Sequence, residues 1–244
     1  MKTVIMGDTH GRSLWKLIVH QEQDADRIIF VGDYFDSFDI SGVEQIHNFK
    51  EIIEYKKTSG KEVVLLVGNH DYHYFPEIGY TGTSGYQTVL APSISQVVDE
   101  NREHLQMAYK FDNILCTHAG VTKTFMNSVY GEEGWSIDSV DSELNELFKY
   151  KPKSFKFTLN YGTKLANPYG DDIWQSPIWV RPRSLQKDGV DKKKYIQVVG
   201  HSTQNQIDIK GKSTGGRYYY IDTLGTSGEY IVVKDNIISN GSTR

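Results

Sequence analysis

The stretch Glu62-Val63-Val64-Leu65-Leu66-Val67-Gly68-Asn69-His70-Asp71 decides the fold of this chain. Its first six residues end in an unbroken apolar run, which predicts a buried β-strand. A glycine ends the run, and an amide, an imidazole and a carboxylate follow directly. Ligands of open α/β sheets bind beyond the carboxyl ends of the strands. The stretch therefore predicts a strand that carries functional side chains at its C-terminal end.

Four other predicted strands, at residues 2–6, 27–31, 113–116 and 195–199, end in the same way. They lead into Gly7-Asp8-Thr9-His10-Gly11, Gly32-Asp33-Tyr34-Phe35-Asp36, Thr117-His118-Ala119-Gly120 and Gly200-His201-Ser202-Thr203. A single histidine after a strand is more often structural than functional. The repetition of the pattern, from residue 8 to residue 201, indicates one site built by distant segments.

The segments between these strands predict helices and loops. Apolar spacing near the helical period predicts helices over 12–21, 43–59, 93–107, 121–130 and 139–150. Ser41-Gly42-Val43-Glu44 is a capping box before the second of them. Residues 72–92, rich in tyrosine and glycine, predict a surface loop near the site, and 151–182 predict a long excursion over it. Strands at 217–221, 229–233 and 236–238 are expected to end the chain.

Length and composition describe an ordinary globular protein. Because the motifs span most of the 244 residues, we expect a single domain over 1–244. A net charge of −4 disfavours a general nucleic-acid or membrane surface. One cysteine, Cys116, permits no internal disulfide, and the first strand leaves no room for a signal peptide. No run approaches the ~18 apolar residues of a membrane-spanning helix. The expected compartment is the cytoplasm.

The side chains at the strand ends form a typical set of metal ligands. They are Asp8, His10, Asp33, Asn69, His118 and His201. Carboxylate, imidazole and amide donors together favour a borderline divalent metal. We expect manganese, with iron, zinc, cobalt or nickel as alternatives. Six ligands exceed the needs of one catalytic ion, so two ions are expected, and Asp33 is the candidate bridge. Two such ions can promote displacement at phosphorus.

These motifs resemble those of the calcineurin-like metallophosphoesterase superfamily, over residues 7 to about 225. The resemblance is closest to the phosphoprotein phosphatase branch, which includes symmetrical diadenosine tetraphosphate hydrolases. It implies an α/β fold in which two mixed β-sheets pack as a sandwich flanked by helices. It also implies that His70 is the general acid and that Asp36 orients it. An arginine near a tryptophan binds phosphate in this branch; Pro177-Ile178-Trp179-Val180-Arg181 is similar, so Arg181 is the candidate.

The sequence departs from the pattern of this branch at one place. The branch continues its second motif as Asp-Arg-Gly, whereas Asp36 is followed by Ser37 and Phe38. Arg12 and Arg183 are candidates to replace the missing arginine, and Asn69 is a further candidate for contact with substrate. Thr203 stands where the wider superfamily often has a second histidine, which favours the phosphoprotein branch over nucleases and cyclic-nucleotide enzymes.

The expected function is a phosphomonoesterase of the serine/threonine protein phosphatase type, in which metal ions activate water. Its partner would be a phosphorylated protein or nucleotide. Hydrolysis of dinucleoside polyphosphates, a nucleotide or nucleic-acid phosphodiesterase, and a non-catalytic scaffold remain alternatives. A cysteine phosphatase is disfavoured, because Cys116 would need an arginine at position 122, which is threonine. The remaining histidines are expected at the surface, with one close enough to support the site: His20, His47, His104 and, near the site, His73.

Overall fold

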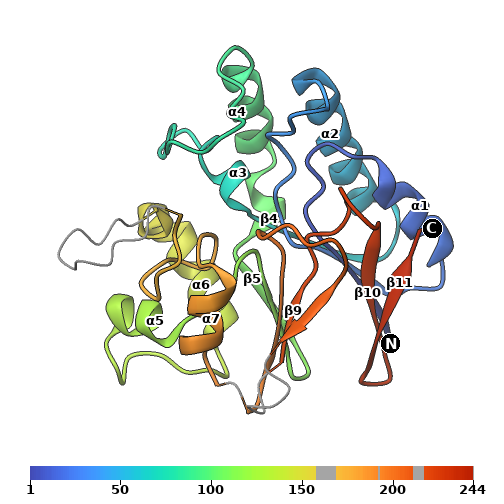
Figure 1. Cartoon of the computed structure of the whole chain (residues 1–244). Coiled ribbons are helices and arrows are strands. Elements are labelled where there is room, and N and C mark those ends of the chain that lie inside the picture. The colour runs from blue at the N-terminus through green and yellow to red at the C-terminus, as the bar shows by residue number, and fades with distance from the viewer. Residues whose placement is uncertain (158–168, 192, 211–216, 244) are drawn as a thin grey trace.

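The computed structural model describes residues 1–157, 169–191, 193–210 and 217–243. This part of the chain forms two mixed β-sheets that pack face to face, with helices over their outer surfaces (Figure 1). The α/β sandwich expected from the resemblance is confirmed. Residues 158–168, within the stretch expected to pass over the site, lie outside the described part.

The first sheet has the strand order β11-β10-β1-β2-β3-β4. Its strands are β1 (Lys2–Met6), β2 (Arg27–Phe30), β3 (Glu62–Leu66), β4 (Leu105–Gln106), β10 (Glu229–Lys234) and β11 (Ile237–Ser242). Strands β1 to β4 are parallel, so their carboxyl ends meet at one edge. β10 runs antiparallel to β1, and β11 runs antiparallel to β10.

The second sheet has the order β5-β6-β7-β9-β8. Its strands are β5 (Ala108–Phe111), β6 (Ile114–Thr117), β7 (Ile196–Val199), β8 (Asp208–Lys210) and β9 (Arg217–Tyr220). β6, β7 and β9 are parallel, whereas β5 and β8 are antiparallel strands at the two edges. The loops that follow the central parallel strands of both sheets therefore lie in a common region.

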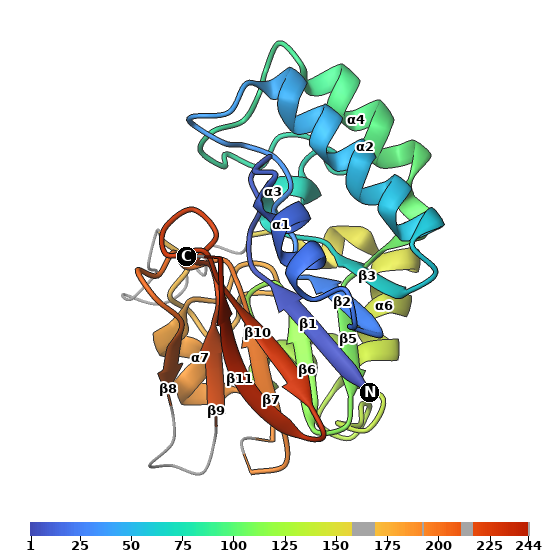
Figure 2. The ribbon, with the colours of Figure 1, turned by 90° about the vertical axis from the view of Figure 1, so that its right-hand side faces the viewer.

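Helices connect the strands and cover the sheets. They are α1 (Leu14–Gln21), α2 (Gly42–Thr58), α3 (Asn69–Tyr72), α4 (Ala91–Glu100), α5 (Lys123–Tyr130), α6 (Val140–Tyr150) and α7 (Pro182–Asp188), with 3₁₀ turns at Arg102–His104 and Pro152–Phe155. The predicted capping box is confirmed: Ser41 Oγ accepts from the Glu44 amide, and the Glu44 carboxylate accepts from the Ser41 amide. Figure 2 shows α2 and α4 side by side above the first sheet.

Burial on both faces explains the unbroken apolar runs of the central strands. Val4 and Ile28 belong to the cluster under α1, α2 and α4, whereas their neighbours Ile5 and Ile29 belong to the cluster between the sheets. Strands covered on both sides need no polar face, so they lack the alternation typical of half-exposed strands. This rigid core holds the strand ends in place.

Some predicted boundaries were wrong. The helix predicted over 93–107 covers Ala91–Glu100, and Leu105–Gln106 instead pair with Leu65–Leu66 at the edge of the first sheet. β5, β8 and α7 were not predicted, because short elements at sheet edges carry little periodicity. In the part of the chain that the structure describes, no helix has the length and apolar character needed to cross a bilayer.

Candidate metal centre and active site

The parallel strands bring all six predicted ligands to one place. Each of five of them follows a strand or begins the helix after it: Asp8 after β1, Asp33 after β2, Asn69 after β3, His118 after β6 and His201 after β7. His10 lies two residues beyond Asp8. The loops therefore converge as the sequence predicted, although they come from both sheets.

Asp33 lies at the centre of this cluster. Its Oδ2 atom lies 3.3 Å from His118 Nε2 and 3.9 Å from His10 Nε2. Asn69 Oδ1 lies 3.0 Å from His118 Nε2 and 2.7 Å from His201 Nδ1. Asp8, Asp33 and His118 each offer a ligand atom, and these atoms lie within 4.8 Å of one another. One carboxylate oxygen thus faces histidines on two sides.

The three histidine rings are each oriented by a backbone carbonyl. His10 Nδ1 lies 2.6 Å from the Phe35 oxygen, and His118 Nδ1 lies 2.9 Å from the Val31 oxygen. His201 Nε2 lies 3.1 Å from the Trp179 oxygen. A carbonyl can only accept, so the facing nitrogen carries the proton in each ring. When such a ring is neutral, its other nitrogen points into the cluster with a lone pair that could bind a metal ion.

Two glycines of the motifs leave room for the carboxylates. A Cβ atom on Gly200 would lie 1.9 Å from Asp8 Oδ1, and one on Gly68 would lie 2.1 Å from Asp33 Oδ1. Asp8 Oδ2 accepts from the His201 amide at 2.9 Å, whereas its buried Oδ1 has no hydrogen-bond partner among the described residues. A buried, unpaired carboxylate oxygen is costly unless a cation binds it.

The electrostatics of the cluster also suit a cation. Burial raises the pKa of Asp8 well above its ordinary value, and the charges of Asp222 and Asp33 add to this. Burial alone would also raise the pKa of Asp33. The electrostatic interactions with His118 and His70 have the larger combined effect and hold this pKa well below its usual range. Burial, with Arg181 and His118 nearby, lowers the pKa of His201 well below its usual value. Neutral His201 beside crowded carboxylates matches a site for positive ions.

Among the described residues, four of the eight non-glycine residues with positive φ lie in the same loops. Non-glycine residues adopt positive φ at His10 (44°), Asp33 (53°), Asp36 (64°) and His201 (65°). Each such conformation costs about 1–3 kcal/mol and persists only where the surrounding structure enforces it. The fold therefore holds these side chains in imposed positions rather than relaxed ones.

His70 and Asp36 form the pair that the resemblance implied. His70 Nδ1 lies 2.9 Å from Asp36 Oδ2, and the Tyr74 hydroxyl donates to Asp36 Oδ1 at 2.5 Å. Burial acts to lower the pKa of His70, but the charges of Asp33 and Asp36 raise it above its ordinary value. The protonated imidazole is therefore favoured, as a proton donor requires.

His73 is part of this arrangement and was wrongly expected at the surface. Its side chain is 1% exposed, and its Nε2 atom lies 2.8 Å from Asp36 Oδ2. The loop 72–92 is also less open than expected, because Tyr74 is buried and stacks on Tyr86 with ring centroids 5.1 Å apart. The sequence indicated that His73 lies close to the site, but it gave no sign that the side chain is buried.

Asp71 has a structural role that the sequence did not reveal. Its Oδ2 accepts from the amides of Asp33 and Gly68, both at 2.8 Å, and its Oδ1 accepts from the Tyr34 amide at 2.7 Å. One buried carboxylate thus ties the loop after β2 to the loop after β3. Burial and the charge of Asp33 raise the pKa of Asp71 to about 7.

Substitution of Asp71 by Asn is expected to destabilise the protein, because the amide nitrogen would face a backbone donor. An unsatisfied buried donor costs about 1–3 kcal/mol, and we expect a loss in this range for the metal-free protein. Urea unfolding followed by circular dichroism measures it. The matched control is Asp112→Asn, an exposed residue. Equal unfolding free energies for the two variants would contradict this role.

Asp222 is a further buried carboxylate that the sequence reading missed. It follows β9, lines the same pocket as Asp8 and His10, and accepts from the Thr203 hydroxyl at 2.7 Å. Burial raises its pKa, while the Thr203 hydrogen bond acts in the opposite direction. The signal was present: the predicted strand 217–221 is followed by an aspartate, which is the pattern of the other strand ends.

The three candidate phosphate-binding arginines lie in different places. Arg12 lines the pocket, and its Nη2 contacts the Asp39 carboxylate at 2.9 and 3.1 Å. Arg181 Nη1 donates to the His201 carbonyl at 3.1 Å and to Ser202 Oγ at 3.3 Å, and Arg181 is not among the described residues that line the pocket. Arg183 is exposed on α7 and is not among the described residues that line the pocket.

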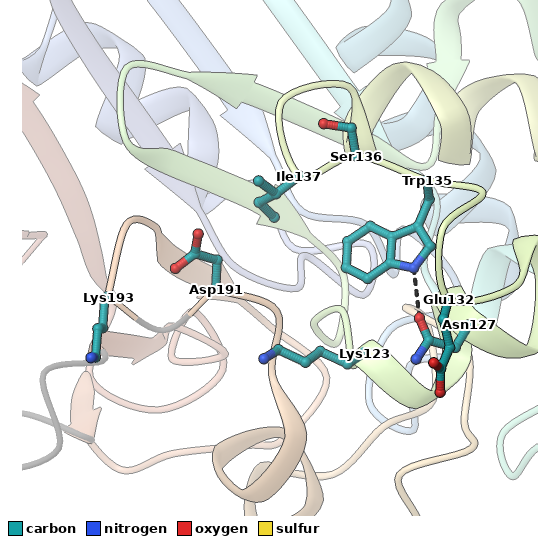
Figure 3. A pocket seen from close by; sticks show the side chains of 8 residues that line it. All are labelled: Lys123, Asn127, Glu132, Trp135, Ser136, Ile137, Asp191 and Lys193. Atoms are coloured by element: carbon teal, nitrogen blue, oxygen red, sulfur yellow. Dashed lines mark hydrogen bonds between the residues drawn. The ribbon is translucent and has the colours of Figure 1, made fainter.

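The pocket over the cluster has a volume of about 290 Å³. A larger hollow of about 840 Å³ is lined by residues of α5, by the loop before α6 and by Asp191 and Lys193 (Figure 3). There, Trp135 Nε1 donates to Asn127 Oδ1 at 2.7 Å, and the Lys123 and Lys193 side chains extend along the wall. No histidine is among the described residues that line it. The chemistry therefore points to the smaller pocket.

Comparison with known proteins agrees with this geometry. The chain resembles the structure of a cold-active protein-tyrosine phosphatase from a Shewanella species, with a TM-score of 0.64, 16% identity, and coverage of 99% of this chain and 77% of the other. It also resembles a protein serine/threonine phosphatase from Saccharomyces cerevisiae, with a TM-score of 0.56, 15% identity, and coverage of 100% and 80%. At such identities the likeness shows the fold alone.

No curated protein sequence matches the chain. The family of calcineurin-like phosphoesterases matches residues 1–225, which is most of the sequence. The chain therefore belongs to the calcineurin-like phosphoesterase family and is a metal-dependent hydrolase of phosphate esters.

Proposed function

We propose that the strand-end cluster binds two divalent metal ions, with manganese as the expected metal. Asp8 and His10 would hold one ion, and Asn69, His118 and His201 would hold the other. Asp33 would bridge the two ions. The observation that carries this proposal is the position of Asp33 Oδ2, between His10 Nε2 at 3.9 Å and His118 Nε2 at 3.3 Å. The unpaired oxygen of Asp8 supports it.

The residues around this site suit the hydrolysis of a phosphate monoester. Two bound divalent ions supply an activated water and neutralise phosphate oxygens. His70, held by Asp36, would give its proton to the departing ester oxygen. Arg12 lies at the pocket wall, where its guanidinium can pair with a phosphate oxygen and replace the arginine missing at position 37. Arg181 would hold His201 in place through its hydrogen bond to the His201 carbonyl.

The substrate that we propose is a phosphorylated protein. The similar structures named above are described as protein phosphatases, which supports this class. The tyrosine-rich loop gives limited support to dinucleoside polyphosphates, because Tyr74 is buried and stacked on Tyr86, which leaves Tyr80 as the largely exposed tyrosine of the loop. A pocket of about 290 Å³ also favours a compact phosphate group.

A substrate panel with manganese tests this proposal. It compares an aryl phosphate monoester, an aryl phosphate diester, diadenosine tetraphosphate and a phosphopeptide by kcat/KM. We expect the monoester and the phosphopeptide to be hydrolysed with the highest kcat/KM. A higher value for the diester or for the dinucleotide would overturn the assignment.

Substitution of Tyr74 by Phe is expected to lower kcat for an alkyl phosphate monoester while leaving KM nearly unchanged. The change removes the hydrogen bond to Asp36, which holds the proton donor His70. A hydrogen bond to a charged group contributes about 1.5–3 kcal/mol. If half of this free energy acts on the transition state, kcat should fall by about 4- to 13-fold.

Tyr86→Phe is the matched control for this experiment, because it removes a hydroxyl from the neighbouring ring of the same stack. Steady-state kinetics of both variants give the comparison. Equal kcat values for the two variants would show that Tyr74 does not position Asp36.

A further inference from the structure

Phe38 is an exposed aromatic residue at the wall of the catalytic pocket. Its side chain is 83% exposed, and it lines the pocket together with His70 and Asp36. It lies two residues after Asp36, which holds the proposed proton donor. Phe38 is thus an apolar side chain at the rim of a pocket that is otherwise lined mostly by polar and charged residues.

The turn that carries Phe38 is fixed on both sides. Ser37 Oγ donates to Asp39 at 2.7 Å and accepts from the amides of Asp39 and Ile40 at 3.3 and 3.2 Å. Arg12 contacts the Asp39 carboxylate from the pocket side. Gln45 Nε2 donates to the Ile40 carbonyl at 2.6 Å, and Gln45 Oε1 accepts from the Ser37 amide at 3.3 Å. The backbone is therefore held while the ring stays in water, so binding costs little ordering of the chain.

The charges around the ring define what it can contact. The same pocket is lined by the carboxylates of Asp36, Asp39 and Asp222. Among its described lining residues, Arg12 is the one lysine or arginine. Arg12 is already paired with Asp39. A substrate with additional phosphates near Phe38 would bring further negative charge close to these carboxylates, whereas an uncharged ring would not. An aromatic ring on a phosphate would pack against Phe38 without adding charge beside these carboxylates.

We propose that Phe38 determines specificity for aryl phosphate monoesters by packing against the aromatic ring that carries the phosphate. In a protein substrate that group is phosphotyrosine. This inference rests on the proposed phosphomonoesterase function. In the reaction, a water oxygen bonds to phosphorus, the bond from phosphorus to the phenolic oxygen breaks, and His70 protonates that oxygen. The products are a tyrosine and inorganic phosphate, and His70 regains its proton from solvent.

Two peptides of identical sequence, one with phosphotyrosine and one with phosphoserine, test the proposal with manganese-loaded protein. We expect the wild type to favour the phosphotyrosine peptide. Phe38→Ala should lower kcat/KM for the phosphotyrosine peptide by about 2- to 13-fold, because aromatic pairs contribute about 0.5–1.5 kcal/mol beyond area burial and 1.36 kcal/mol corresponds to tenfold. It should change kcat/KM for the phosphoserine peptide by less than about twofold. Phe38→Trp should preserve the preference.

The matched control is Tyr150→Ala, which removes an aromatic ring that is 70% exposed on α6. It should change neither peptide's kcat/KM. A benzylic phosphonate serves as a second probe: Phe38→Ala should weaken its inhibition of the enzyme and leave inhibition by methylphosphonate unchanged.

Equal effects of Phe38→Ala on both peptides, or no effect on either, would overturn the role of Phe38. The proposed phosphomonoesterase function would still stand in that case. If the wild type hydrolysed neither peptide and no simple aryl monoester, the proposed function itself would fail, and this inference with it.

Discussion

Replacing Asp33 by Asn is expected to lower kcat by about 10³-fold or more, since metal ions contribute several kcal/mol to the transition state and 1.36 kcal/mol corresponds to tenfold. The physical reason is the position of Asp33 Oδ2, which faces His10 and His118 together. A neutral amide is a poor bridge between two cations, and it adds a donor nitrogen to a cluster that should contain acceptors. The wild type should bind two manganese ions per chain, and the variant fewer.

The fold should survive this change. Asp33 Oδ1 accepts from the His70 amide at 2.9 Å, and an asparagine oxygen can keep that bond. Removing a charge also relieves repulsion with Asp8. Manganese should raise the melting temperature of the wild type, because a ligand that binds the folded state stabilises it. The rise should be much smaller for the variant. Asp112→Asn is the control for charge removal. Near-wild-type turnover of Asp33→Asn would refute the bridge.

Replacing His70 by Asn is expected to reduce kcat for alkyl phosphate monoesters by about 10²–10⁴-fold, which is the usual contribution of general acid catalysis. The loss should be far smaller for p-nitrophenyl phosphate, whose leaving group needs no proton. The backbone amide of residue 70 still donates to Asp33 in this variant, so the metal cluster should remain intact.

Kinetics on the two esters and metal analysis of the same sample provide the measurement. His47→Asn is the control, because His47 is exposed and lies outside the cluster. Equal losses on the alkyl and the activated ester would remove His70 from the role of proton donor. Loss of bound manganese would instead indicate that His70 supports the cluster.

The convergence of the predicted ligands followed from the sequence because parallel strands align their carboxyl ends. Asp8, Asp33 and Asn69 each come directly after a run that is apolar on both faces, and such runs leave little choice of position in a sheet. The same logic applies to His118 and His201 in the second sheet. Local order along the chain was therefore enough to predict that these side chains come together, although it did not identify Asp222 of the same pocket.

Other features depend on tertiary contacts that no local pattern encodes. Asp71 lies within the most informative stretch of the sequence, yet its role comes from amides of the loop after β2. His73 was misplaced because its burial depends on Asp36 and on the tyrosine stack. Arg12 and Arg183 looked equivalent as candidates, and only the folded chain shows that Arg12 lines the pocket.

Anomalous diffraction from a manganese-loaded crystal, recorded at the manganese absorption edge, tests the central claim most directly. We expect two peaks about 3.5–4 Å apart, with Asp33 bonded to both ions, His10 bonded to one and His118 to the other. A single peak, or a pair in which Asp33 contacts one ion alone, would contradict the claim.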